Sequence, residues 1–166
     1  GLNCSGAELG HTVIKAGGRQ CSCGRLGCWE AYSSATALKE ITKEKMRELE
    51  IKGIGSALFD EARKEGFVSA RTAFNAAKAS DKYAQEIVDE YIANLAVGIT
   101  DMINIFQPEI ITIGGGVSAE KENLTIPLSR IAEQEQYTRR NKKKTHITVA
   151  TLGNDAGIIG AAGLGY

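Results

Sequence analysis

Residues 109–118 read EIITIGGGVS and decide the class of fold. Residues 110–113 are a β-branched run, which is typical of a buried parallel strand. The glycines at 114–116 form a turn, and Ser118 is placed to cap a helix expected at roughly 119–135. A strand, a glycine turn and a helix are the unit of α/β folds with parallel strands.

The flanking sequence extends this pattern in both directions. Apolar residues recur at helical spacing over residues 81–106, and the width of their stripe predicts a long helix buried on much of its circumference. Residues 146–150 are a second β-branched strand, and residues 156–164 are a helix of small residues. The order of these elements indicates an α/β fold with parallel strands.

The N-terminal half is expected to be mainly helical after a glycine-rich start. Ser80 or Asp81 can cap the long helix, and Pro108 ends it. The other expected elements are a strand at 12–15 and helices from Glu30 onward, at about 49–64 and at 69–79.

The composition is that of one ordinary domain. The chain has 166 residues, with 20 basic and 20 acidic side chains, so its net charge gives no general attraction to nucleic acid or to acidic membranes. The basic run at 139–144 is interpreted as a solvated loop. No apolar segment reaches membrane-spanning length and no signal peptide is visible, so we expect a cytoplasmic protein. The first residue is not Met, and we expect the chain to begin partway through a longer protein.

A cysteine cluster, CSCGRLGCWE at residues 21–30, raises the question of a metal, a disulfide or reactive thiols. Its cysteines, Cys21, Cys23 and Cys28, follow a C-x-C-x4-C spacing, which in a cytosolic protein favours metal binding over disulfides. With His11 they supply four ligands for tetrahedral zinc, and four protein ligands close the coordination sphere, so the site would be structural. Unliganded thiols in a glycine loop remain the alternative.

Two glycines inside the cluster support this interpretation. Gly24 and Gly27 permit the tight turns that would bring three sulfur atoms together. Cys4 lies outside the spacing and is interpreted as an ordinary thiol.

Taken together, these motifs resemble the ROK family of sugar kinases and repressors. The resemblance rests on GAELGH (6–11), CSCGRLGCWEAY (21–32), IITIGGGVS (110–118) and LGNDAGIIGAA (152–162). It implies the C-terminal half of an actin-like, ribonuclease-H-like ATPase domain with a zinc-binding loop. It divides the single domain at 1–166 into a zinc and sugar loop at 1–32 and nucleotide-side segments at 110–118 and 151–163.

The resemblance also implies roles for individual residues. The zinc ligands would be His11, Cys21, Cys23 and Cys28. Glu8 and Glu30 match carboxylates that accept hydrogen bonds from sugar hydroxyls, and His11 would touch the sugar through its other ring nitrogen. The nucleotide would be held by Gly114, Gly115 and Gly116 through their backbone N–H groups, with Asn154 on the adenine side.

Two kinase motifs of the family do not occur at their proper places in this sequence. They are an Asp-x-Gly-Gly-Thr phosphate motif and an Asn-Asp pair whose Asp is the general base. Asn154-Asp155 lies too late in the chain to take that role. We therefore expect no catalytic residue and no kinase activity in this chain alone. Loss of the first strands would leave residues 110–113 near an exposed sheet edge. Members of the family usually dimerise through this domain, so the resemblance also implies a homo-oligomer.

Three functions follow as hypotheses. The first is part of a glucokinase-like enzyme of glycolysis that uses ATP with Mg²⁺ to phosphorylate the 6-hydroxyl of a hexose. Glucose is preferred only because it is frequent among ROK kinases. The second is the sugar-sensing domain of an ROK transcriptional repressor, and the third is a zinc-stapled interaction domain without a ligand.

Overall fold

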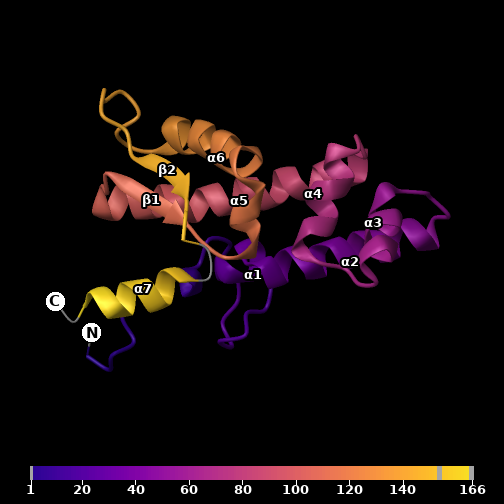
Figure 1. Cartoon of the computed structure of the whole chain (residues 1–166), viewed down its shortest axis with the longest axis horizontal. Helices are drawn as coiled ribbons and strands as arrows, with labels where there is room; N and C mark the ends of the chain where they lie inside the picture. Colours follow the sequence, from indigo (N-terminus) through magenta and orange to yellow (C-terminus); the bar gives the residue numbers. More distant parts are fainter. Residues whose placement is uncertain (1, 153–154, 165–166) are drawn as a thin grey trace.

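The computed structural model describes residues 2–152 and 155–164, and the chain in it is mostly helical (Figure 1). In order the elements are η1 (Leu9–His11), α1 (Glu30–Ser33), α2 (Ala35–Ile51), α3 (Ala57–Glu65), α4 (Ala70–Lys78), α5 (Lys82–Phe106), β1 (Ile110–Ile113), η2 (Gly116–Glu120), α6 (Glu122–Glu135), β2 (His146–Val149) and α7 (Ala156–Gly163). None of the helices in this described part combines the length and apolar character needed to cross a bilayer.

Helix α5 is the centre of the molecule and confirms the long helix predicted from periodicity (Figure 1). It packs against α1, α2, α4 and α6, and its buried side chains run from Ala84 to Ile103. The helix ends at Phe106, and Gln107 follows in the left-handed conformation just before Pro108. Proline cannot continue a helix, so the chain turns here into β1.

Asp81 joins the starts of two helices. Its carboxylate accepts hydrogen bonds from the N–H groups of Tyr83 and Ala84 at 2.9 Å, which caps α5. It also accepts from Ser56 Oγ at 2.8 Å and from the Ala57 N–H at 2.7 Å, at the start of α3. Burial alone would raise the pKa of Asp81, but these hydrogen bonds outweigh it and the pKa is lowered.

The sheet of the described residues consists of β1 and β2, which pair in parallel from Ile110 opposite His146 to Ile113 opposite Val149. This confirms the predicted α/β pattern. The expectation that β1 is buried was wrong in this chain, because Ile110 is 59% exposed. Helix α6 packs on the sheet, and Ile111 and Ile113 of β1 pack against the core, so the described residues cover only one face of the strand.

Three predicted boundaries also need correction in the N-terminal half and after β1. The expected strand at 12–15 forms only a single antiparallel bridge between Val13 and Cys28. The expected helix at 49–64 is two helices, because α2 continues to the buried Leu49 and the glycine-containing link at 52–56 then separates it from α3.

The third boundary is the helix after the glycine turn. Ser118 does not cap it. The Ser118 hydroxyl instead donates to the Gly115 carbonyl at 2.7 Å and closes a 3-10 turn, η2. Helix α6 begins only at Glu122, after Lys121 at a φ of 49°. The N-terminus of α6 is therefore set back from the glycine turn by the length of η2.

Candidate metal and sugar site

Residues 8–32, called the metal loop below, fold back on themselves through tight turns. Antiparallel bridges join Val13 to Cys28 and Gln20 to Leu26. Gly27 has a φ of 84°, and a Cβ there would lie 1.7 Å from a backbone oxygen, so no other residue fits this position. Gly24 has a φ of 88°. Both glycines serve the tight turns predicted from the sequence.

The turns bring the four predicted ligands together. The ligand atoms of His11, Cys21, Cys23 and Cys28 all lie within 4.8 Å of one another. Cys21 Sγ is 3.6 Å from His11 Nδ1, and Cys23 Sγ is 3.6 Å from Cys28 Sγ. Tetrahedral zinc with bonds of 2.0–2.3 Å would separate its ligand atoms by about 3.6–3.8 Å. A disulfide requires about 2.05 Å, so the four side chains fit a metal ion and the cysteines are free thiols.

The thiols differ in their acidity. A hydrogen bond from the Cys23 backbone lowers the pKa of Cys21 to about 7. Burial raises the pKa of Cys28 to about 11. At neutral pH the protein alone would hold Cys28 as a thiol, and a bound cation is what would make both groups thiolates.

Glu30 lies directly against this cluster. Ser22, between two of the cysteines, donates its hydroxyl to Glu30 Oε1 at 3.1 Å. Cys21 Sγ is 3.9 Å from the same oxygen. A Cβ on Gly10 would lie 3.4 Å from the Glu30 Cβ, so η1 passes close to the base of this side chain. The metal loop therefore sets the direction of the Glu30 carboxylate.

The other two predicted sugar contacts flank η1, with Glu8 immediately before it and His11 as its last residue. Glu8 is exposed at its start, and its carbonyl accepts from the His11 N–H at 3.1 Å. Because His11 turns Nδ1 toward Cys21, its Nε2 is the atom left to face elsewhere. Arg25 donates to the His11 carbonyl at 2.9 Å and fixes this turn.

A hollow of about 630 Å³ opens beside Glu30. Cys21, Ser22 and Ser34 also line it, and the volume lies in the range of small-molecule sites. Within the described part of the chain, its lining includes neither Glu8 nor His11. The structure thus brings Glu30 to a cavity but does not gather the three predicted sugar contacts around one enclosed space.

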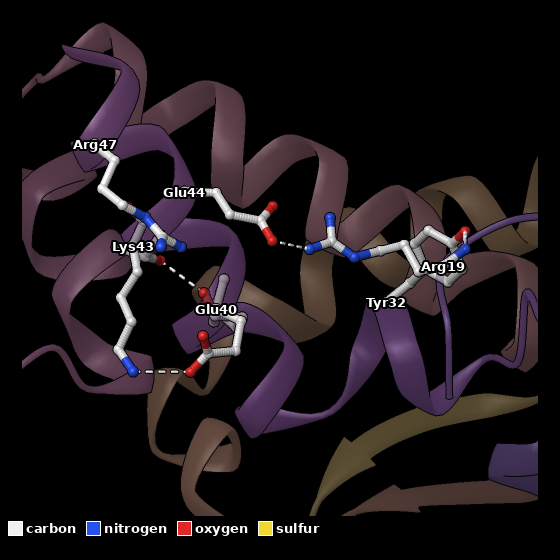
Figure 2. A network of polar contacts seen from close by, with 8 residues as sticks. Arg19, Tyr32, Glu40, Lys43, Glu44 and Arg47 are labelled. Carbon is white, nitrogen blue, oxygen red and sulfur yellow. Dashed lines mark hydrogen bonds and ion pairs between the residues drawn. The ribbon is translucent and has the colours of Figure 1, made fainter. Parts of the chain in front are cut away.

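Polar contacts tie the metal loop to the helices (Figure 2). The Arg19 guanidinium donates to Glu44 of α2, and the Arg19 backbone N–H donates to the Tyr32 hydroxyl at 2.6 Å. The Lys15 ammonium lies 4.7 Å from the centre of the Tyr32 ring and 3.8 Å from Glu90 of α5. Arg19 therefore joins the metal loop to α2, and Lys15 joins it to α5.

The predicted nucleotide-side segments meet at the carboxyl edge of the sheet. The Ala150 N–H donates to the Ile113 carbonyl at 2.8 Å, so the turns after β1 and β2 start side by side. Gly115 has a φ of 81° and a ψ of −176°, a conformation open only to glycine. Among the described residues, no heavy atom lies within 4 Å of a Cβ added at Gly114, Gly115 or Gly116, so this part of the chain leaves the turn open. Asn154 lies outside the described residues.

Two contributors to the site were not predicted. Ser22 orients Glu30, but a serine between cysteines carries no sequence signal for a partner eight residues away. Gly98 of α5 faces Trp29, the neighbour of Glu30, and only the helical pattern with one interior glycine hinted at a close approach there.

Comparison with known proteins identifies the family of the chain. The ROK family model matches residues 1–165. The chain belongs to the ROK family. A glucokinase from Halalkalibacterium halodurans is 38% identical over 165 residues, which cover 99% of this chain and 48% of that relative. A xylose repressor from Caldicellulosiruptor bescii is 28% identical and covers 78% of this chain and 31% of the repressor. The chain spans about half the length of the glucokinases it matches.

Solved structures give the same result for the fold. A ROK family glucokinase from Streptomyces griseus, solved with glucose and AMPPNP, aligns with a TM-score of 0.77 at 26% identity. The alignment covers 96% of this chain and 51% of that one. The fold is therefore that of ROK kinases, which belong to the actin-like ATPase class.

Proposed function

We propose that this chain is the C-terminal, single-domain half of an ATP-dependent hexose kinase, with glucose as the preferred substrate. The complete protein would transfer the ATP γ-phosphate to the sugar 6-hydroxyl with the help of Mg²⁺, in the cytoplasm and at the entry to glycolysis. The 38% identity to a glucokinase over nearly the whole chain supports the enzyme class. The observation that carries the sugar site is the contact of Glu30 with the cysteine cluster.

The metal in this proposal is structural zinc bound by His11, Cys21, Cys23 and Cys28. When bound, it would supply no reaction step and would fix the directions of its ligands. His11 would then present its protonated Nε2, and Glu30 its carboxylate, to hydroxyl groups of the same sugar. Glu8 would add a second acceptor from η1.

On the nucleotide side, the residues proposed to bind ATP are Gly114, Gly115, Gly116 and Asn154. The open turn and the glycine-only conformation of Gly115 support backbone contact with a phosphate or ribose. We propose that the general base is supplied by sequence outside this chain, that residues 1–166 alone do not phosphorylate glucose, and that the protein forms a homodimer.

Metal analysis and phosphorylation assays test this proposal. The purified chain should retain about one zinc per molecule under the four-ligand arrangement. A full-length protein containing this sequence should phosphorylate glucose with ATP, and Glu30→Gln should raise KM for glucose while zinc content stays unchanged. Phosphorylation of glucose by the zinc-loaded 166-residue chain itself would refute the proposed absence of a base.

The second candidate is the sugar-sensing domain of a repressor. The relationship to the xylose repressor, 28% identical over 131 residues, favours keeping it. A repressor needs the sugar side but no nucleotide side. Binding of glucose without any binding of AMPPNP by the full-length protein would therefore favour the repressor over the kinase.

A further inference from the structure

Trp29 is the single tryptophan of the chain and stands between Cys28 and Glu30. Its indole packs on α5 at Gly98. A Cβ built on Gly98 would lie 2.1 Å from Trp29 Cε2 and 2.2 Å from Cδ2. Carbon atoms in contact need about 3.5 Å, so any side chain at position 98 would have to displace the indole by about 1.4 Å.

This glycine is unfavourable for the helix that carries it. Gly98 lies inside the 25-residue helix α5, where glycine is less favourable than alanine by about 1 kcal/mol. Gly98 is also buried, so solvent exposure does not explain its presence. Helix α5 therefore carries a residue of low helix propensity at position 98, where a larger side chain would overlap the Trp29 indole.

A second contact from α5 binds the C-terminal end of α1. The Tyr91 hydroxyl donates to the carbonyl of Ser33, the last residue of α1, at 2.9 Å. Tyr91 and Gly98 are seven residues apart and lie on the same face of α5. Burial raises the pKa of Tyr91 to about 12, so the hydroxyl stays a donor at neutral pH. Helix α1 is thus held between Trp29 at its start and Ser33 at its end.

We propose that Gly98 is a positioning residue for the metal and sugar site and acts through Trp29. The inference rests on the proposed function, because it concerns the same Cys28 and Glu30. Each of them is one peptide unit, about 3.8 Å, from Trp29, so a displaced indole moves both. Zinc ligands tolerate distance errors of about 0.2 Å, far less than the displacement that a methyl group would force.

Gly98→Ala tests this inference because two effects have opposite signs. Helix propensity alone would stabilise the variant, whereas displacement of the Trp29 indole would weaken metal binding at the site. We expect Trp29 emission to move to longer wavelength and the affinity for Co²⁺, used as a spectroscopic probe of the zinc site, to fall about tenfold or more. Val97→Ala is the control, because Val97 is the exposed neighbour on the same helix.

Rescue separates positioning from general damage. Gly98→Ala combined with Trp29→Leu removes the overlap and should bind Co²⁺ more tightly than Gly98→Ala alone. If Gly98→Ala does not fold, Trp29→Phe takes its place as the test. Trp29→Phe fills the space beside Gly98 only partly and should still weaken Co²⁺ binding. Wild-type Co²⁺ affinity in Gly98→Ala or in Trp29→Phe, an equal loss in Val97→Ala, or no recovery in the double variant would overturn the inference.

Hydrogen exchange distinguishes this inference from the proposed function. Failure of the unaltered chain to bind Zn²⁺ or Co²⁺ would refute the metal site, but amide exchange at residues 28–33 can still be compared between the unaltered chain and Gly98→Ala when both are metal-free. Faster amide exchange at residues 28–33 in Gly98→Ala, with unchanged exchange in α4 and α6, supports a positioning role for the packing of Trp29 on Gly98. Unchanged exchange at residues 28–33 overturns it, whatever the metal result.

Discussion

The metal loop and the nucleotide-side segments are built in opposite ways. In the metal loop, side chains from residues spread over 8–32 converge, and Cys28 is fully buried. At the proposed nucleotide side, the turns that follow β1 and β2 start at the same sheet edge, and described side chains nearby are exposed. Leu152 is 51% exposed and Ile158 of α7 is 74% exposed.

In the proposed function, the two regions would owe their specificity to different features. The metal loop would depend on a few side chains that no other residue type can replace, so single changes there should be severe and local. The nucleotide side would depend on backbone conformation, so most substitutions should be tolerated and only a position with a special φ and ψ should matter. Substitutions that act on one region and spare the other test this comparison.

The largest effect is expected from Cys28→Ser. Structural zinc contributes about 10–16 kcal/mol of apparent folding free energy in small zinc peptides, and a buried hydroxyl is a poor replacement for the thiolate. We expect zinc to be lost and amide exchange to become fast across residues 8–32, while β1 and β2 stay protected. Metal analysis and hydrogen exchange measure both.

Cys4→Ser is the matched control, because Cys4 is exposed and outside the cluster. It should retain zinc and wild-type exchange. Equal loss of protection in the metal loop and in the sheet after Cys28→Ser would mean that the two regions unfold as one unit, against the comparison.

Asp81→Ala should lower the stability of both regions together. The carboxylate caps α5 and bonds the first residues of α3, and each lost cap costs about 0.5–2 kcal/mol. We expect the free energy of unfolding to fall by about 3 kcal/mol, measured by urea denaturation. Asp81→Asn keeps one acceptor oxygen and should lose less. A loss confined to the metal loop would show that α5 does not support the sheet.

The same carboxylate predicts a pH dependence. Its pKa is lowered in the folded chain from a usual value of 3.8. The stability it contributes is therefore complete above that value and is lost as the pH falls through the folded pKa. Between pH 5 and pH 2, the unaltered chain should lose more stability than Asp81→Asn, and parallel losses in urea titrations would contradict the assigned role.

Gly115→Ala should affect the nucleotide side alone. A Cβ at this φ and ψ costs about 1–3 kcal/mol or reshapes the turn. Gly114→Ala is the matched control, because Gly114 has no positive φ and a Cβ there would meet no close neighbour among the described residues. We expect a full-length protein with Gly115→Ala to lose AMPPNP affinity while retaining zinc, and Gly114→Ala to retain both. Equal affinities in the two variants would remove the special role of Gly115.

The sequence predicted what depends on periodicity and spacing. It indicated the apolar face of α5, the parallel pairing of β1 with β2, and the convergence of His11 with the cysteines. It did not predict the contacts that individual side chains make once the loop has folded and docked. The bond from Ser22 to Glu30 and the seat of Trp29 on Gly98 depend on how the loop docks, and no local pattern encodes docking.

The burial predicted from the β-branched run of β1 was wrong for a related reason, although the resemblance to the family had placed residues 110–113 near an exposed sheet edge. A β-branched run indicates a strand but not how many neighbours the strand has. Ile110 is exposed because β2 is its partner among the described residues and α6 covers one face. Similarly, the strand expected at 12–15 has the right residues, but Ile14 and Lys15 both donate to the single carbonyl of Gly27, so no ladder forms.

The smallest effect is expected from Arg19→Gln, at the edge of the metal loop. Its guanidinium pairs with Glu44, which raises the pKa of Arg19, but both side chains are exposed by more than a third (Figure 2). Exposed ion pairs contribute about 0–1 kcal/mol, and salt screens them. We expect zinc retention to be unchanged and the free energy of unfolding to fall by less than about 1 kcal/mol, with the difference vanishing in 1 M NaCl. Loss of zinc in Arg19→Gln would show that docking on α2, rather than the convergence of four ligands, holds the metal loop together.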